Sequence, residues 1–249
     1  MKALVTGASS GIGRDMARYL SSLGYDIIAV ARDGKALNQL KEELSTKVET
    51  ISMDLADTDA CKQLYKFVKK QKIDILVNNA GFGDFGEFTN TDLDKELNMI
   101  DVNIKAIHIL TKLFLQDMVK RDTGYILNVA SIAGFMPGPL MATYYSTKSY
   151  IVRLTQGLYT ELKKNKSKVS ISVLCPGPVN TNFNKVANVH FNLKGQSSQY
   201  VAKYAIDKML KGKLMILPGV KIKIARLLAK ISPEKIVARV CMKVQEKKR

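Results

Sequence analysis

The sequence has no tryptophan, two histidines and only three cysteines in 249 residues. Cys61, Cys175 and Cys241 are odd in number, far apart and not spaced as metal ligands. That arrangement predicts neither a disulfide framework nor a zinc or other metal site. We therefore expect the cysteines to lie in the interior as small apolar side chains.

A secretion signal and a long uninterrupted apolar run are also missing. Met1 and Lys2 are followed at once by the apolar run ALVTG, which leaves no room for the segments of a signal peptide. Residues 123–147 carry no charge, but Asn128, Gly134 and Pro137 interrupt them, so we expect no membrane span there. These features predict a cytoplasmic protein.

Acidic side chains are scarce relative to basic ones. The chain carries 22 Asp or Glu against 39 Lys or Arg, for a formal net charge of +17. Ten of the basic residues, against two Glu, follow from Gly219 onward. The remaining composition, 46% hydrophobic and 24% charged, is that of a folded domain, and the length suits one large α/β domain.

Short β-rich runs alternate with helical patterns along the chain. The strands we expect are residues 2–6, 26–31, 48–53, 73–78, 124–131, 169–175 and 214–217. Apolar residues between them recur at helical spacing in three stripes that should face the sheet: Ile12, Met16, Leu20 and Leu23; Ile100, Ile104, Ile107 and Leu110; Ile151, Leu154, Leu158 and Leu162. This alternation predicts an α/β fold, with a doubly wound parallel sheet of about seven strands and helices on both faces.

The first predicted strand runs into a glycine-rich turn, VTGASSGIGR, at residues 5–14. A strand followed by such a turn and a helix leaves backbone N–H groups free to bind a diphosphate, as in Rossmann-type folds, although a purely structural glycine turn has similar spacing. The residues that we assign to cofactor binding here are Gly7, Ser9, Ser10, Gly11, Ile12 and Gly13.

The residue after the second predicted strand bears on the choice of cofactor. Dinucleotide-binding folds usually place an acidic residue there, against the ribose 2′-hydroxyl of NAD. This chain has Arg32, whose guanidinium pairs with a 2′-phosphate, so NADP(H) is favoured over NAD. Asp33 follows, and a shift of one residue would reverse that preference. Arg14 is either a further cofactor contact or the partner of a nearby carboxylate.

The segment YYSTK places Tyr144 and Lys148 four residues apart at the start of a predicted helix, on one face. A nearby ammonium stabilises a phenolate, so Tyr144 is a candidate proton donor. Ser131 ends a predicted strand at the carboxyl edge of the sheet, where open α/β folds bind ligands. Its hydroxyl is placed to donate to a substrate oxygen.

Together these residues resemble the short-chain dehydrogenase/reductase family in its single-domain form, and the chain is similar to bacterial members of broad or unassigned specificity. The resemblance covers residues 1 to about 218, and the motifs that carry it follow the family's order: Thr6-Gly7 to Gly13, Asp54-Leu55, Asn78-Asn79-Ala80-Gly81, Asp101-Val102-Asn103, Ser131, Tyr144-x-x-x-Lys148 and Pro176 to Thr181. It implies an NADP-binding Rossmann domain at 1–218 with a substrate loop at 182–196. A basic amphipathic helical extension follows at 219–249.

The resemblance also implies roles in hydride transfer between a nicotinamide and a carbonyl or alcohol. Tyr144 would exchange the proton and contact the cofactor, and Ser131 would polarise the substrate oxygen. Lys148 would lower the Tyr144 pKa and bind the nicotinamide ribose. Asn103 would hold a water that relays protons, or else only bend its helix. The other cofactor contacts that it implies are Asp54, Leu55, Asn79, Ala80, Gly81, Pro176, Gly177, Val179 and Thr181. Asn78 and Asn79 are equally suited to tying neighbouring strands together.

Apolar residues surround the expected substrate position. The loop after Thr181 contributes Phe183, Val186, Val189, Phe191 and Leu193, and residues 134–142 form a second wall, so the substrate should be hydrophobic. His190 is a bystander or a polar contact, and Phe82, Phe85 and Phe88 line the site or pack a surface loop. A narrower alternative is reduction of a 3-oxoacyl thioester on coenzyme A or an acyl carrier. A rival from another class is a non-catalytic NADP-binding protein that associates with a membrane or acts as a scaffold.

The basic tail has two predicted helical pieces separated by the sequence ISPE. Contact with its own domain or within a homo-oligomer, a dimer or tetramer as is common in the family, is the first interpretation. Weak contact with an anionic membrane is the second. Nucleic acid is not expected as a partner, because the tail lacks the aromatic residues of a stacking platform.

Overall fold

The computed structural model describes residues 1–181, 183 and 195–246. Its centre is a seven-stranded sheet in the order β3-β2-β1-β4-β5-β6-β9, in which each neighbouring pair is parallel. The strands are β1 (Lys2–Thr6), β2 (Asp26–Ala31), β3 (Val48–Ser52), β4 (Ile75–Asn78), β5 (Tyr125–Val129), β6 (Ser170–Leu174) and β9 (Met215–Ile216). The order reverses between β1 and β4, which confirms the predicted doubly wound sheet.

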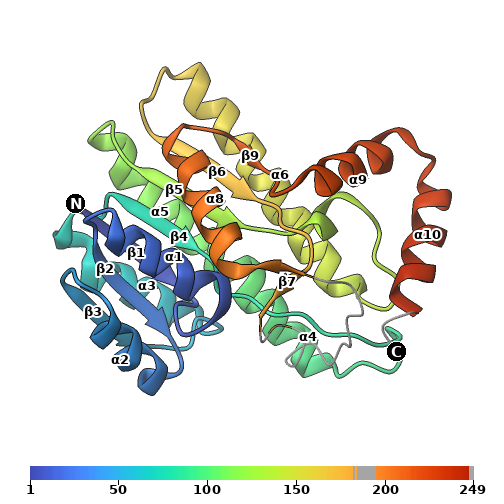
Figure 1. Ribbon diagram of the computed structural model, residues 1–249, viewed down its shortest axis with the longest axis horizontal. Helices are drawn as coiled ribbons and strands as arrows, with labels where there is room; N and C mark the ends of the chain where they lie inside the picture. Colours follow the sequence, from blue (N-terminus) through green and yellow to red (C-terminus); the bar gives the residue numbers. More distant parts are fainter. Residues whose placement is uncertain (182, 184–194, 247–249) are drawn as a thin grey trace.

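Helices cover both faces of this sheet (Figure 1). One face packs against α1 (Gly11–Ser22), α2 (Gly34–Glu43) and α8 (Ser198–Leu210). The other packs against α3 (Thr58–Val68), α5 (Ile107–Lys120) and α6 (Ala142–Lys164). Because helices lie on both sides, the strands are buried on both faces and read as continuous apolar runs in the sequence.

The remaining short elements lie at the edges of these layers. They are η1 (Lys69–Gln71), α4 (Leu93–Ile100), the π-helix η2 (Asp101–Ala106), η3 (Ile132–Phe135), and a separate parallel pair, β7 (Val179–Asn180) with β8 (Gln196–Ser197). The three cysteines are buried, as predicted.

One residue of the predicted stripes is misplaced. Met16 and Leu20 of α1 are fully buried against the sheet, but Leu23 is 41% exposed. The helix ends at Ser22, and Gly24, with φ of +85°, turns the chain toward β2, so Leu23 no longer lies on the helical face.

Two helices follow β9. They are α9 (Val220–Ile231) and α10 (Glu234–Glu246), separated by Ser232 and Pro233. In Figure 1 they extend beyond the sheet at the end of the molecule where α6 begins. Within the described ranges, no helix combines the length and the apolar character needed to cross a membrane.

Candidate active site

The four predicted catalytic residues come from three segments at the carboxyl edge of the sheet. Ser131 follows β5, Asn103 lies in η2, and Tyr144 and Lys148 lie in the first two turns of α6. Tyr144 is 9% exposed, Lys148 4% and Asn103 fully buried. The structure therefore gathers these polar groups where the protein excludes most solvent.

Burial changes the acid–base properties of the tyrosine and the lysine. It raises the pKa of Tyr144 to about 12, although a hydrogen bond with Ser131 acts in the lowering direction. It lowers the pKa of Lys148 to about 8. Lys148 Nζ lies 5.7 Å from the centre of the Tyr144 ring and donates to the backbone oxygen of Val129 at 3.2 Å. In this state desolvation outweighs any lowering of the Tyr144 pKa by Lys148.

Ser131 joins the end of β5 to the start of η3. Its backbone is extended, and its Oγ accepts a hydrogen bond from the Ala133 N–H at 3.2 Å, so it caps the short helix. This contact fixes the hydroxyl on the side of the sheet where Tyr144 lies. The Ser131 O–H is thus held beside the phenol with which it forms a hydrogen bond.

Asn103 connects the loop after β4 to α6. Its Nδ2 donates to the backbone oxygen of Phe82 at 2.9 Å and to Thr147 Oγ1 at 3.0 Å, and its Oδ1 accepts from the Phe82 N–H at 3.1 Å. Thr147 in turn donates to the backbone oxygen of Tyr144 at 2.7 Å. The hydrogen-bond partners of Asn103 belong to other segments of the chain and not to its own helix. The alternative in which Asn103 only bends its helix does not account for these bonds. Its π-helical position is a geometry that recurs at functional sites.

The glycine turn between β1 and α1 has the geometry needed for close approach of a ligand. Gly7 has φ of +65°, and a Cβ there would lie 2.8 Å from Asn79 Nδ2. A Cβ at Gly13 would overlap the backbone oxygen of Gly7. Ser10 precedes the first turn of α1 without capping it through its side chain, which leaves N–H donors for an anion. These residues fit the diphosphate of a dinucleotide.

Other predicted cofactor residues surround this turn. The methyl group of Thr181 lies 3.0 Å from the position of a Cβ at Gly11. Asn79 Nδ2 donates to the backbone oxygens of Thr6 and Gly7 at 3.0 and 3.2 Å. Asn79 therefore ties β4 to the turn. Asn78, whose Nδ2 donates to Asn128 Oδ1 at 2.9 Å, likewise ties neighbouring strands.

Arg32 and Asp33 have different tasks at the end of β2. Asp33 Oδ1 accepts a hydrogen bond from the Ala36 N–H at 3.0 Å and so caps α2. Arg32 is 70% exposed, and its guanidinium lies 3.8 Å from the carboxylate of Asp54. Arg14, by contrast, pairs with Glu43. The exposed cation here is therefore Arg32, while the neighbouring carboxylate is engaged by the backbone.

The remaining predicted contacts lie along the same edge. Leu55 is buried, and the Gly81 position lies against Asn103 Oδ1 and Lys148 Nζ, 2.8 and 3.3 Å from where its Cβ would be. The backbone oxygen of Pro176 accepts from the Ile132 N–H at 2.9 Å. Gly177 contacts Ile222 of α9, and Val179 begins β7. Ala80 donates its N–H to Thr6 Oγ1 at 3.0 Å.

An apolar cluster surrounds the Tyr144 ring. Its buried members are Met99, Ala133, Met141 and Tyr144, and Phe82, Phe85, Tyr145 and Phe183 pack against it. The Phe183 ring lies 5.4 Å from that of Tyr144. Phe88 is 67% exposed and lies outside this cluster. Met99 and Tyr145 were not predicted, because nothing in their spacing separates them from ordinary core residues. Val186, Val189, His190, Phe191 and Leu193 lie outside the described residues.

Comparison with known proteins agrees with this geometry. The family model described as short chain dehydrogenase matches residues 1–190. An uncharacterized oxidoreductase of Staphylococcus epidermidis is 37% identical over 182 residues, which are 72% of this chain and 78% of that protein. Very-long-chain 3-oxoacyl-CoA reductase-B of Danio rerio is 35% identical over 192 residues, 74% of this chain and 61% of that protein.

Solved structures share the fold over nearly the whole chain. A short-chain dehydrogenase from Sphingobium yanoikuyae in complex with NADPH superposes with a TM-score of 0.82 and 26% identity, covering 94% of this chain and 96% of that one. A short-chain dehydrogenase/reductase from Burkholderia phymatum in complex with NAD has a TM-score of 0.83 and 24% identity, covering 91% of each chain, a likeness of fold alone.

Proposed function

This chain belongs to the short-chain dehydrogenase family, and we propose that it is an NADP(H)-dependent oxidoreductase that acts on a carbonyl or secondary alcohol of a hydrophobic substrate. The catalytic residues are Ser131, Tyr144 and Lys148, with Asn103 as the residue that positions them. One observation carries the proposal. A buried tyrosine bonded to Ser131 faces an apolar cluster at the carboxyl edge of the sheet.

The protonation state of the site suits reduction. A pKa of about 12 keeps Tyr144 protonated at neutral pH, so its O–H is available to a carbonyl oxygen. Bound NADPH would supply the hydride. Ser131 donates to the same oxygen and polarises the carbonyl. In this proposal the ammonium of Lys148, whose Nζ lies 5.7 Å from the centre of the Tyr144 ring, stabilises the phenolate that remains.

The preference for NADP(H) rests on the end of β2. A 2′-phosphate needs a cation that is not already neutralised, and Arg32 is exposed with only a long ion pair to Asp54. Asp33 is the residue that would instead select NAD, but its carboxylate caps α2. The NADPH complex of the Sphingobium yanoikuyae protein supports the same choice by likeness.

A second candidate function is reduction of a long-chain 3-oxoacyl thioester. The relative from Danio rerio has that activity in its name, and this chain spans about three-fifths of it. The cluster of Met99, Met141, Phe82 and Phe183 suits an acyl chain. A net charge of +17 favours the acidic coenzyme A or carrier.

The test is consumption of NADPH with pairs of substrates that share one acyl length, a 3-oxoacyl-CoA and the matching free ketone. Turnover of either by the wild type, lost in Ser131→Ala, supports the proposal. The second candidate is favoured if the KM for the thioester is lower than that for the free ketone and increases with salt concentration. If NADPH binds and no carbonyl compound of the panel is reduced, the chain is a nucleotide-binding protein without this activity, and the proposal is wrong.

A further inference from the structure

Helix α9 exposes the apolar side of an amphipathic helix. Val220, Ile224, Leu227, Leu228 and Ile231 are each 51–68% exposed. With 3.6 residues per turn they lie on one side of the helix. The opposite side faces the protein, where Ile222 contacts Gly177 and packs on the cluster of Cys175 and Leu217. The protein therefore covers one side of α9 and leaves its most apolar side open.

Cations border the exposed apolar side of α9. By helical periodicity Lys221 lies along one border, and Lys223 and Lys230 lie along the other. All three lysines are exposed. An apolar stripe flanked by lysines is the pattern of helices that lie in the plane of a membrane surface.

Helix α10 lies at an angle to α9 (Figure 1) and exposes a second apolar strip, with cations along one of its borders. It docks through Cys241 and Gln245, whose Nε2 donates to the Tyr145 hydroxyl at 2.7 Å. Ile236, Val240 and Val244, on the side away from that contact, are 44–55% exposed. Lys235, Arg239 and Lys243 lie beside them on the exposed surface.

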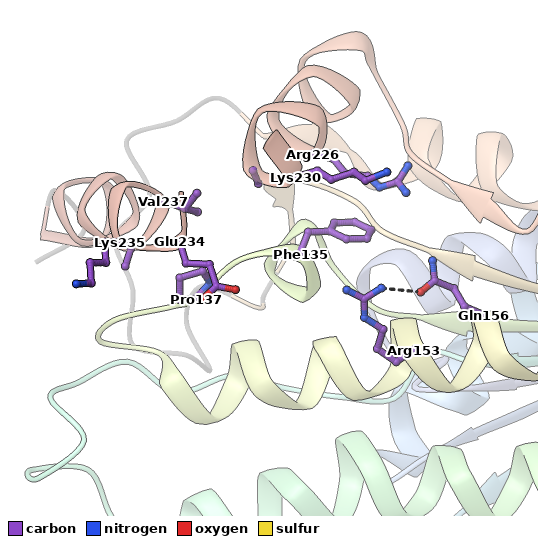
Figure 2. A pocket seen from close by; sticks show the side chains of 11 residues that line it. Phe135, Pro137, Arg153, Gln156, Arg226, Lys230, Glu234, Lys235 and Val237 are labelled. Carbon is purple, nitrogen blue, oxygen red and sulfur yellow. Dashed lines mark hydrogen bonds between the residues drawn. The ribbon is translucent and has the colours of Figure 1, made fainter. Parts of the chain in front are cut away.

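A cleft of about 740 Å³ beneath the two helices adds to the positive charge. Among the described residues that line it, the cations are Arg153 of α6, Arg226 and Lys230 of α9, and Lys235 of α10, and the acidic residue is Glu234. Figure 2 shows Arg226 and Lys230 on α9, near Phe135 and across from Arg153. Among the described residues none of these four cations forms an ion pair, and Arg226 instead lies over the Phe135 ring at 5.0 Å.

We propose that α9 and α10 dock the protein on the surface of an anionic lipid bilayer. The exposed apolar side chains enter the boundary between headgroups and acyl chains, while the flanking lysines meet lipid phosphates. The cleft cations lie behind them and add to the positive potential that attracts the anionic surface. A second copy of the chain fits this surface less well. A two-fold contact through the same patch would bring like charges together, with no carboxylate apart from those of Glu234 and Glu246 on these helices to offset them.

The orientation that follows places the substrate side of the protein at the membrane. Gln245 of α10 bonds Tyr145, the residue next to the proposed proton donor Tyr144. Docking would therefore hold the apolar cluster around Tyr144 close to lipid. The docking itself does not depend on turnover, so it is testable apart from the proposed function.

The test is co-sedimentation of the full chain with vesicles of phosphatidylcholine alone and with vesicles that contain phosphatidylglycerol. We expect binding to the anionic vesicles only, weakened by high salt. The variant Ile224→Ser/Leu227→Ser/Leu228→Ser should bind the anionic vesicles with an affinity reduced by about tenfold or more, because it removes the inserted side chains. It should still bind NADPH, since these residues do not support the core. Phe67→Ser, on α3 and 65% exposed, is the matched control and should bind as the wild type does.

Other outcomes would overturn the inference. Equal sedimentation with both vesicle types, or with neither, excludes an anionic bilayer as the occupant. If light scattering instead shows a dimer that the triple serine variant dissociates, a second copy covers this surface. If Phe67→Ser lowers vesicle binding as much as the triple variant does, the binding is not specific to α9.

Discussion

The ammonium of Lys148 lies 5.7 Å from the centre of the Tyr144 ring, and both side chains are buried. Burial moves their pKa values in opposite directions, to about 12 for the phenol and about 8 for the ammonium. Lys148 has the Val129 carbonyl oxygen as its hydrogen-bond partner, and no carboxylate forms an ion pair with it among the described residues. The buried positive charge of Lys148 therefore lowers the free energy of unfolding of the protein.

Replacement of Lys148 should show this loss of stability directly. Its pKa in the folded protein lies below the unfolded value of 10.5, so its charge destabilises the fold fully below pH about 8, and the penalty disappears as pH rises through about 10.5. Lys148→Met should stabilise the ligand-free protein at pH 7 by about 1–3 kcal/mol, less at pH 10, while activity is lost. Urea unfolding at both pH values measures this.

The exposed Lys112 on α5 provides the control for this prediction. Lys112→Met should change the free energy of unfolding by no more than about 0.5 kcal/mol at either pH, because its side chain is in solvent. A destabilising effect of Lys148→Met at pH 7 would contradict the prediction.

Removal of the Tyr144 hydroxyl should abolish proton transfer without loss of cofactor. Tyr144→Phe should lower kcat by about 10²–10⁴-fold, the usual contribution of a positioned general acid, and should change NADPH affinity far less. Stopped assays of turnover and fluorescence titration of NADPH measure the two quantities. Tyr150→Phe, on the same helix and bonded to His108, should keep full activity. Equal activity of the two variants would remove Tyr144 from the mechanism.

Arg32 should determine the preference between the two nucleotides. Loss of a charge-assisted bond to the 2′-phosphate should weaken NADPH binding by about 10–100-fold and leave NADH binding nearly unchanged. Titration of Arg32→Ala with both nucleotides tests this. Arg14→Ala is the control, because the Arg14 guanidinium pairs with Glu43 and should not affect the ratio. A ratio that does not change in Arg32→Ala would show that Arg32 does not select the nucleotide.

The two helical glycines Gly13 and Gly157 should respond in opposite ways to alanine. A Cβ at Gly13 would overlap the backbone oxygen of Gly7, whereas a Cβ at Gly157 in α6 meets no atom within 4 Å. Gly13→Ala should therefore destabilise the turn and weaken nucleotide binding. Gly157→Ala should stabilise the protein by about 0.5–1 kcal/mol, because alanine is the better helix former. Thermal unfolding with and without NADPH measures both effects. Equal shifts of the unfolding temperature in the two variants would contradict the prediction.

The sheet was predictable because its strands are buried on both faces. Apolar runs such as residues 2–6 and 26–31 coincide with β1 and β2 to the residue. The later strands are shorter than their predicted ranges, because pairing rather than composition sets their ends. The run at 124–131 continues apolar beyond Val129, but the ladder of β5 with β6 ends at the pair Val129 and Leu174.

The site was predictable from spacing but not its electrostatics. Spacing pointed to Tyr144, Lys148 and Ser131, and the family resemblance added Asn103; the structure places all four at one edge of the sheet, and their catalytic roles stay predictions. The sequence suggested that Lys148 lowers the Tyr144 pKa, but desolvation, which depends on packing from distant segments, dominates in the opposite direction. The exposure of the apolar side of α9 could not be predicted from the sequence either. Periodicity shows that a helix has an apolar side but not which side its own domain covers.

The contact between Gly177 and Ile222 joins two segments that otherwise serve different purposes. Gly177 belongs to the segment of residues 176–181, which reaches the glycine turn through Thr181, and Ile222 holds α9 against the domain. A ligand that shifts residues 176–181 would therefore change the free energy with which α9 packs on the domain, and a shift of α9 would change the free energy of ligand binding at residues 176–181. By thermodynamic linkage this coupling is reciprocal. If a bound nucleotide changes the affinity of α9 for its occupant by some factor, that occupant changes the affinity for the nucleotide by the same factor.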